Sequence, residues 1–195
     1  MAKIKRPKPK TKIPKQAKKV FSGVLFDIYQ WKQKMFDGST STFEAIKRKS
    51  DSVGVIPVTK DKKIILTKQI HPAREPFRCT VGGRTDPGET PIETAKREML
   101  EESGCVAKSF VLLYKNQPSS KIDFAVYVFA ALGAEKVTKP NPEPGEKIKV
   151  IKTDFEGFLK IATRADFRAR ETSEIAFRAL SNPKYKAWLK KKLGL

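Results

Sequence analysis

The sequence is poor in several residue types that mark particular classes of protein. It has two cysteines, Cys79 and Cys105, which are too few for the disulfide framework of a small secreted protein. No apolar run approaches the roughly 18 residues that span a bilayer, and no apolar segment follows the basic N-terminus as in a signal peptide. These absences predict a cytoplasmic protein with reduced thiols and no membrane partner.

Acidic residues are absent from the first 19 positions, which carry nine Lys or Arg. Such a charged, proline-interrupted segment cannot form a core, so residues 1–19 are expected to be a disordered basic tail. The whole chain has a formal net charge of +20, which favours a polyanionic partner or substrate. The tail therefore either contacts RNA or only keeps the protein soluble.

The hydrophobic pattern beyond the tail predicts a small N-terminal β extension over residues 20–50 and one domain over residues 51–195. Strands are expected at 20–33, 42–50, 51–59, 63–70, 109–115, 122–132 and 147–153. Helical patterns follow at 153–162, 171–180 and 183–193. Many strands, one central helix and closing helices indicate an α+β or α/β fold, with a mixed sheet and helices on its faces.

The central helix is predicted over residues 91–103. Thr90 and Glu93 have the spacing of a capping box, and Pro91 suits the first helical position. Gly104 suits the residue that ends a helix. These local signals bound the helix at both ends.

Three carboxylates, those of Glu98, Glu101 and Glu102, share one face of this predicted helix. Like charges at this spacing repel by roughly 0.2–0.5 kcal/mol per exposed pair. Arg97 can neutralise only part of this charge. The cluster is either a solvated acidic face or a site for a hard divalent cation such as Mg²⁺ or Mn²⁺.

The glycine-rich loop before the helix completes a longer pattern. It runs Gly83, five residues, Glu89, seven residues, Arg97-Glu98, then Glu101-Glu102 and Gly104. This pattern resembles the signature of the Nudix hydrolases, GX5EX7REUXEEXGU, in which U is apolar. Every fixed position matches, and Met99 and Cys105 stand where Ile, Leu or Val is usual.

The resemblance implies an α/β/α sandwich that hydrolyses a nucleoside diphosphate linked to another group, with Mg²⁺ or Mn²⁺ as cofactor. Carried over to this chain, the metal ligands are Glu98, Glu101, Glu102 and the backbone carbonyl of Gly82. Glu102 and Arg97 are implied in catalysis. A salt bridge from Glu89 to Arg97 braces the loop, while Gly83, Glu89 and Gly104 are structural parts of the motif.

Residues 20–182 also resemble, more loosely, the ADP-ribose pyrophosphatase subgroup. This implies ADP-ribose or another nucleotide sugar as substrate, a nucleoside monophosphate as product and a homodimer formed through the N-terminal extension. The basic termini favour an alternative, hydrolysis of RNA 5′ ends or dinucleoside polyphosphates. A non-catalytic, nucleic-acid-binding module is a third alternative, but its expected sign is a broken glutamate cluster, and this cluster is intact.

The same resemblance assigns the general base to a loop glutamate, which is Glu146 here, with Glu143 as the competitor. The subgroup usually has Gln-X-Arg before the motif, whereas this chain has Gln69-Ile70-His71. We therefore expect Gln69 and His71 to bind substrate, with Arg84 supplying the missing guanidinium. Arg74 and Arg78 are alternatives to Arg84.

Overall fold

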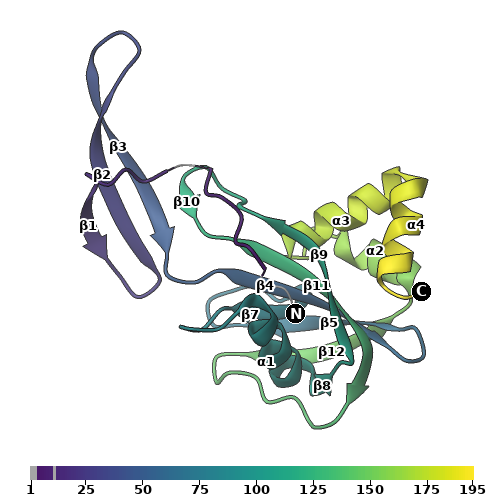
Figure 1. Ribbon diagram of the computed structural model, residues 1–195. Coiled ribbons are helices and arrows are strands. Elements are labelled where there is room, and N and C mark those ends of the chain that lie inside the picture. Colours follow the sequence, from purple (N-terminus) through teal and green to yellow (C-terminus); the bar gives the residue numbers. More distant parts are fainter. Residues whose placement is uncertain (1–3, 11) are drawn as a thin grey trace.

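The computed structural model describes residues 4–10 and 12–195, and it contains a four-stranded and an eight-stranded sheet (Figure 1). The strands are β1 (Lys18–Ser22), β2 (Phe26–Lys34), β3 (Thr40–Arg48), β4 (Ser52–Thr59), β5 (Ile64–Ile70), β6 (Phe77–Cys79), β7 (Val81–Arg84), β8 (Cys105–Val106), β9 (Ser109–Asn116), β10 (Ile122–Asp123), β11 (Val126–Lys136) and β12 (Lys147–Thr153). The helices are α1 (Pro91–Ser103), α2 (Phe155–Ala162), α3 (Arg170–Ser181) and α4 (Pro183–Lys192).

The larger sheet is mixed and lies between two layers of helices. Its strand order is β12-β5-β4-β11-β8, and β6, β7 and β9 pair with β5, β4 and β11. Strand β4 runs parallel to β11 and antiparallel to β7. Helix α1 lies on one side of the sheet and α2 to α4 lie on the other (Figure 1). The sequence prediction of an α/β/α arrangement is therefore confirmed.

Alternate residues of the central strands supply two separate cores. Ile56 on β4 packs in the cluster beneath α2 to α4, together with Phe158. Val55, its neighbour on β4, packs on the opposite face with Met99 of α1. All four side chains are fully buried, which fixes the sheet between its two helical layers. Across residues 4–10 and 12–195, no helix has the length and apolar character needed to cross a membrane.

Helix α1 has the predicted boundaries. Thr90 accepts a hydrogen bond from the backbone N–H of Glu93, and the Glu93 side chain accepts from the backbone N–H of Thr90, which completes the capping box. Gly104 ends the helix in the left-handed conformation, with φ of 69°. Local signals thus determine the residues at which this helix begins and ends.

Two predicted strands are each divided in the structure. The segment 20–33 forms β1 and β2, because a turn closed by the bond from Gly23 N–H to the Phe26 carbonyl reverses the chain. The segment 122–132 is split between β10, which pairs with β3 in the smaller sheet, and β11 in the larger sheet. Alternation in the sequence does not reveal either break.

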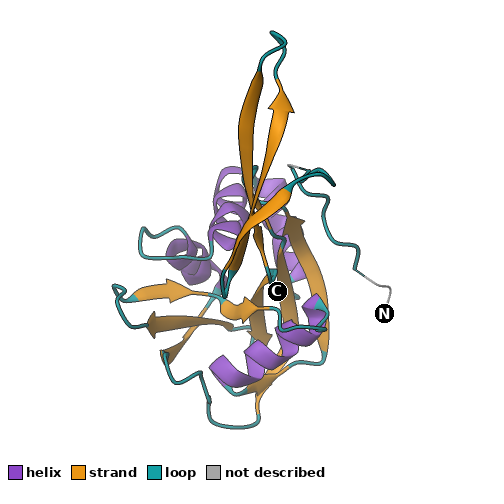
Figure 2. Ribbon diagram, turned by 90° about the vertical axis from the view of Figure 1, so that its left-hand side faces the viewer, coloured by secondary structure: helices purple, strands orange, loops and turns teal. Residues whose placement is uncertain are grey.

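The smaller sheet forms an arm that projects from the main body (Figure 2). It has the order β1-β2-β3-β10. Trp31 is buried in it, with its ring centroid 6.0 Å from that of Phe43. Val24 and Phe36 are almost fully exposed on the same arm.

The expectation of a contact-free tail over residues 1–19 is wrong for several of its residues. Ile4 packs against the core beside α1, and Arg6 lies between two carboxylates. The Arg6 guanidinium is 2.9 Å from Asp51 Oδ2 and 3.0 Å from Asp123 Oδ1. Lys18 and Lys19 also belong to β1 rather than to a tail. Residues 1–3 and 11 of this segment lie outside the described residues.

The ion pairs of Arg6 should contribute to the free energy of unfolding. Arg6→Ala should lower the free energy of unfolding by about 1 kcal/mol, because Asp51 and Asp123 lose their shared cation. Lys8→Ala, which removes an exposed cation two residues away, is the matched control and should change little. Urea unfolding of both variants measures the difference. Equal effects would show that the Arg6 contacts contribute nothing specific.

Candidate active site

A cleft of about 830 Å³ lies where α1, β7, the arm and the loop 141–146 meet, and we call it the glutamate cleft. It is lined by nearly all the predicted site residues: Gln69, His71, Gly82, Gly83, Arg84, Arg97, Glu98, Glu101, Glu102, Glu143 and Glu146. Glu89 and Gly104 are not part of this lining. Residues up to 77 positions apart in the sequence are thus brought to one site.

Glu102 is the most deeply buried carboxylate of the cleft, with 3% of its surface exposed. Its two oxygens accept hydrogen bonds from the Gln69 side chain and from the backbone N–H of Gly82, each at 2.8 Å. Burial raises the pKa of Glu102 well above its ordinary value, and the charges of Glu98 and Glu146 add to this. The hydrogen bonds act in the opposite direction but do not offset the burial.

Glu98 lies one helical turn before Glu102 and packs directly on the backbone of β7. A Cβ atom at Gly83 would lie 2.3 Å from Glu98 Oε1, so a larger residue there would displace this carboxylate from its position. Burial raises the pKa of Glu98 to about 7; Arg97 lowers this pKa, whereas Glu101 and Glu146 raise it. Two carboxylates that cost free energy to ionise are therefore held side by side.

Gly82 has a backbone conformation that few other residues adopt, with φ of +143°. A Cβ atom there would lie 2.1 Å from the carbonyl oxygen of Val53 on the neighbouring strand. The conformation lets the Gly82 N–H donate to Glu102 while β7 stays paired with β4. Gly82 and Gly83 thus let β7 bond Glu102 and leave space for Glu98.

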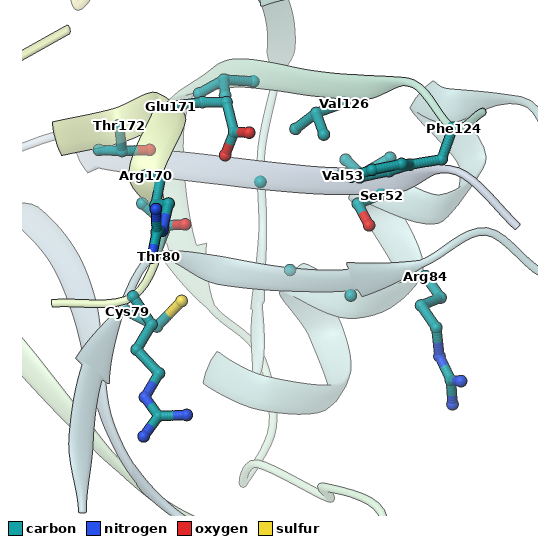
Figure 3. Close-up of a pocket in the computed structure, with 16 residues that line it drawn as sticks. Ser52, Val53, Cys79, Thr80, Arg84, Phe124, Val126, Arg170, Glu171 and Thr172 are labelled. Atoms are coloured by element: carbon teal, nitrogen blue, oxygen red, sulfur yellow. The ribbon is translucent and has the colours of Figure 1, made fainter. Parts of the chain in front are cut away.

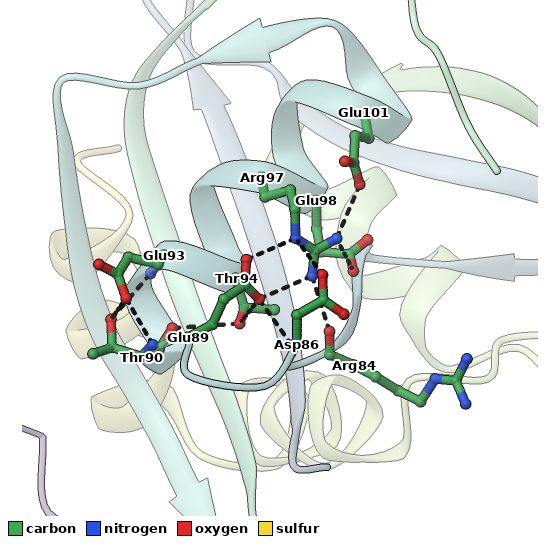
Figure 4. A network of polar contacts seen from close by, with 9 residues as sticks. All are labelled: Arg84, Asp86, Glu89, Thr90, Glu93, Thr94, Arg97, Glu98 and Glu101. Carbon is green, nitrogen blue, oxygen red and sulfur yellow. Dashed lines mark hydrogen bonds and ion pairs between the residues drawn. The ribbon is translucent and has the colours of Figure 1, made fainter. Parts of the chain in front are cut away.

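Arg97 connects the helix to the glycine-rich loop (Figure 4). Its Nε and Nη2 donate to the two oxygens of Glu89 at 2.8 and 3.1 Å, which is the predicted salt bridge. Its Nη1 donates to Glu98 and Glu101, each at 3.0 Å. Its Nη2 also donates to the backbone carbonyl of Arg84. One guanidinium therefore holds the loop and three carboxylates in place.

A chain of polar contacts leads from Glu102 to the loop glutamate. The Gln69 side chain donates to Glu102, and its amide oxygen lies 2.9 Å from His71 Nε2. Because that oxygen can only accept, His71 carries a proton on Nε2. The same nitrogen lies 3.9 Å from Glu146 Oε1. Gln69 is almost completely buried, so it positions Glu102 and His71 from within the cleft wall.

Two lining residues, Arg48 and Phe124, were not identified from the sequence. The Arg48 guanidinium lies 4.6 Å from the centre of the Phe124 ring and donates to Ser52 Oγ. Burial and the nearby charge of Arg84 lower the pKa of Arg48. The two guanidiniums thus crowd one side of the cleft. No motif marks either residue, because Arg48 comes from β3 and Phe124 from the break between β10 and β11.

The donor set of the cleft suits a hard divalent cation. Glu98, Glu101 and Glu102 offer only oxygen atoms, and the buried pair gains most from a cation that favours its ionised form. Arg97 and Gln69 already bond these carboxylates. In the described part of the chain, no group of three or more His, Cys, Asp or Glu is arranged to hold a metal ion without rearrangement.

Comparisons with known proteins show what this chain is similar to. Residues 48–173 match the NUDIX domain. The chain is 31% identical over 149 residues to an ADP-ribose pyrophosphatase of Bacillus subtilis, covering 73% of this chain and 78% of the relative. It is 27% identical over 127 residues to a methanol dehydrogenase activator of Bacillus methanolicus, covering 62% and 66%. A crystal structure of an ADP compounds hydrolase matches with a TM-score of 0.72 at 19% identity, covering 98% of each chain.

The Glu89–Arg97 bond predicts how stability depends on pH. Hydrogen bonding to Arg97 lowers the pKa of Glu89 to about 2 from an ordinary value of 4.5. The stabilisation is therefore fully present above pH 4.5 and is lost as the pH falls towards 2. The unfolding free energy of Glu89→Gln should fall furthest below that of the wild type at neutral pH, and the difference should shrink in acid.

Denaturant unfolding between pH 7 and pH 3 measures this difference. Glu75→Gln, which changes an exposed carboxylate on the loop before β6, is the control and should follow the wild type throughout. A destabilisation by Glu89→Gln that does not vary with pH would contradict the assignment.

Proposed function

This chain belongs to the Nudix hydrolase family, and we propose that it cleaves the diphosphate bond of ADP-ribose or another nucleoside diphosphate sugar. The products would be a nucleoside monophosphate and a sugar phosphate. The observation that carries the proposal is the buried pair of carboxylates, Glu98 and Glu102, at the floor of a cleft with arginines along its side. The ADP-ribose pyrophosphatase of Bacillus subtilis supports the choice of substrate.

The lining of the cleft is complementary to a nucleotide sugar. Arg48, Arg74 and Arg84 offer guanidiniums to phosphate oxygens, for which their planar geometry is suited. Phe26 and Phe77 add aromatic surface on which a base or sugar can pack. The cleft thus joins anion-binding, apolar and acidic regions within one volume.

Nudix hydrolases generally use divalent metal ions, and we propose Mg²⁺ or Mn²⁺ here. Glu102, the Gly82 carbonyl and, once released from Arg97, Glu98 and Glu101 would hold the ion. When bound, such an ion neutralises phosphate charge and lowers the pKa of a water molecule. Arg97 would then keep its bidentate bond to Glu89 and continue to brace the loop.

We assign the general base to Glu146 rather than Glu143. Glu146 is half-buried and lines the same cleft as Glu98 and Glu102, and its charge raises the pKa of both. Glu143 is exposed at the outer part of the same loop. Glu146 would take a proton from the attacking water as the new P–O bond forms and the bridging P–O bond breaks. His71, one contact away, would orient the Glu146 carboxylate.

A substrate panel tests the proposed function directly. Purified protein with Mg²⁺ is offered ADP-ribose, other nucleotide sugars, dinucleoside polyphosphates and RNA with a 5′ triphosphate, and release of monophosphate is measured. We expect the highest kcat/KM for a nucleotide sugar. Preference for dinucleoside polyphosphates or RNA ends would favour the alternative function, and no hydrolysis of any compound would refute the proposal.

Three further predictions accompany this function. Val24 and Phe36 on the arm are exposed apolar side chains that suit a homodimer interface formed by the N-terminal extension. Helix α4 ends in three basic residues, Lys190, Lys191 and Lys192. These residues add to the basic surface that RNA would contact. Cys79 and Cys105 are free thiols, as expected in the cytoplasm. The dimer, the RNA contact and the location all stay predictions.

Glu102→Gln should abolish turnover and weaken divalent-cation binding while the protein remains folded. The neutral amide avoids the cost of burying a charge, so the free energy of unfolding should change by no more than about 1 kcal/mol. Calorimetric titration with Mg²⁺, turnover assays and thermal melts measure the three effects. Glu93→Gln, on the same helix outside the cleft, should retain turnover. Full wild-type activity in excess EDTA would overturn the metal requirement.

Glu146→Gln should lower kcat by roughly 10²–10⁴-fold with a much smaller change in KM, as expected for loss of a general base. Glu143→Gln, in the same loop, is the matched control and should have little effect. Steady-state kinetics over a range of pH separates the two variants. Reversed effects would identify Glu143 as the base, and two wild-type profiles would exclude a base in this loop.

A further inference from the structure

A second cavity, of about 400 Å³, lies between the start of α3 and strands β4, β7 and β11 (Figure 3). We call it the α3 cavity. Gly82, Gly83, Arg84 and Phe124 line both this cavity and the glutamate cleft. The two spaces therefore adjoin along β7 and Phe124.

Thr172 gives the α3 cavity an unusual polar group. The side chain is fully buried, and its hydroxyl oxygen has no hydrogen-bond partner. Within residues 4–10 and 12–195, it is the one buried side-chain nitrogen or oxygen in this condition. Figure 3 shows the hydroxyl directed towards the cavity. A buried hydroxyl without a partner costs free energy, so its presence is explained if a bound molecule supplies the partner.

The start of α3 adds further hydrogen-bonding groups beside Thr172. The helix begins at Arg170 without a side-chain cap, and first-turn N–H groups have no acceptor within their own helix. The Glu171 carboxylate extends into the same space (Figure 3). The cavity thus presents backbone donors, a hydroxyl that can donate or accept, and a carboxylate acceptor.

These groups favour an uncharged ligand with neighbouring hydroxyls. A carboxylate accepts from two hydroxyls of a cis-diol, and the hydroxyl of Thr172 and the helix N–H groups bond their oxygens. Arg84, Arg168 and Arg170 also line the cavity, but their side chains are exposed, and the Arg168 guanidinium stacks on the Phe77 ring. The charged group that extends into the space is the Glu171 carboxylate, which would repel a phosphate (Figure 3). Val126 and Val128 provide apolar walls on which the carbon face of a sugar ring can pack. A ribosyl group combines these properties.

We propose that the α3 cavity binds the ribosyl group at one end of the diphosphate substrate, next to the glutamate cleft. This rests on the proposed function, since the phosphates are taken to lie over Glu98 and Glu102. The glycines at 82 and 83 keep β7 thin, so a ligand that passes Arg84 and Phe124 reaches both spaces. In ADP-ribose the group is either the ribose of the nucleoside or the terminal ribose.

Thr172→Val tests the proposal, because valine keeps the shape of threonine and removes the hydroxyl. Calorimetry with Mg²⁺ gives the Kd of AMP and of ribose 5-phosphate, the products from the two ends of ADP-ribose. The Kd of one product should rise about tenfold, while the other stays unchanged, and this identifies the ribose that occupies the cavity. The melting temperature of the ligand-free variant should be unchanged or higher, since an unpartnered group is lost.

Two variants on the same helix serve as controls. Thr172→Ser keeps the hydroxyl and should keep the wild-type Kd for both products. Ser173→Ala removes a hydroxyl that already bonds the Ala169 carbonyl and lines the groove outside α3, so it should bind both products normally.

The outcomes separate the subsite from the proposed function. If Thr172→Val binds both products as the wild type does, or melts at a lower temperature without ligand, the hydroxyl is solvated or structural and the subsite is refuted. If the wild type hydrolyses no diphosphate but Thr172→Val still loses one product, the proposed function fails and the ribosyl site stands.

Discussion

The burial of two carboxylates on one turn of α1 is the constraint on which the rest of the site depends. Glu98 and Glu102 are largely withdrawn from water, and the charge of Glu98 adds to the cost of ionising Glu102. Such a pair persists only where its surroundings are rigid and well bonded. The capping box fixes the helix, Arg97 fixes the loop, and Gly82 and Gln69 bond the deeper carboxylate.

The distribution of charge separates this acidic floor from the rest of the molecule. The chain has a net charge of +20, yet the cleft gathers Glu98, Glu101, Glu102, Glu143 and Glu146. A positive field over the surface attracts a phosphorylated ligand, while the floor repels it at short range. For the proposed diphosphate substrate, the surface charge would raise the rate of encounter, and the acidic floor would require added positive charge before the phosphates approach closely.

Features encoded locally were predictable from the sequence, whereas those created by the meeting of distant segments were not. Helix α1, its caps and its carboxylate face follow from spacing within a few turns. The short strands β6 and β7 carry no alternation, and the pairing of β10 with the arm depends on tertiary packing. Arg48 and Phe124 meet only because β10 pairs with β3 in the arm. Thr172 was hidden for a different reason, because an unpartnered hydroxyl has no pattern in a sequence.

The contacts of Arg6 have a consequence for how the molecule is made. Its partners Asp51 and Asp123 follow it by 45 and 117 residues, so Arg6 leaves the ribosome before either partner has been made. The parallel pairing of β4 with β11 closes at the same corner and joins segments of similar separation. Contacts so distant in the chain close late in folding. During vectorial synthesis strands β1 to β3 and helix α1 can form first, while the corner beside the cleft waits for the nascent chain to extend beyond β11.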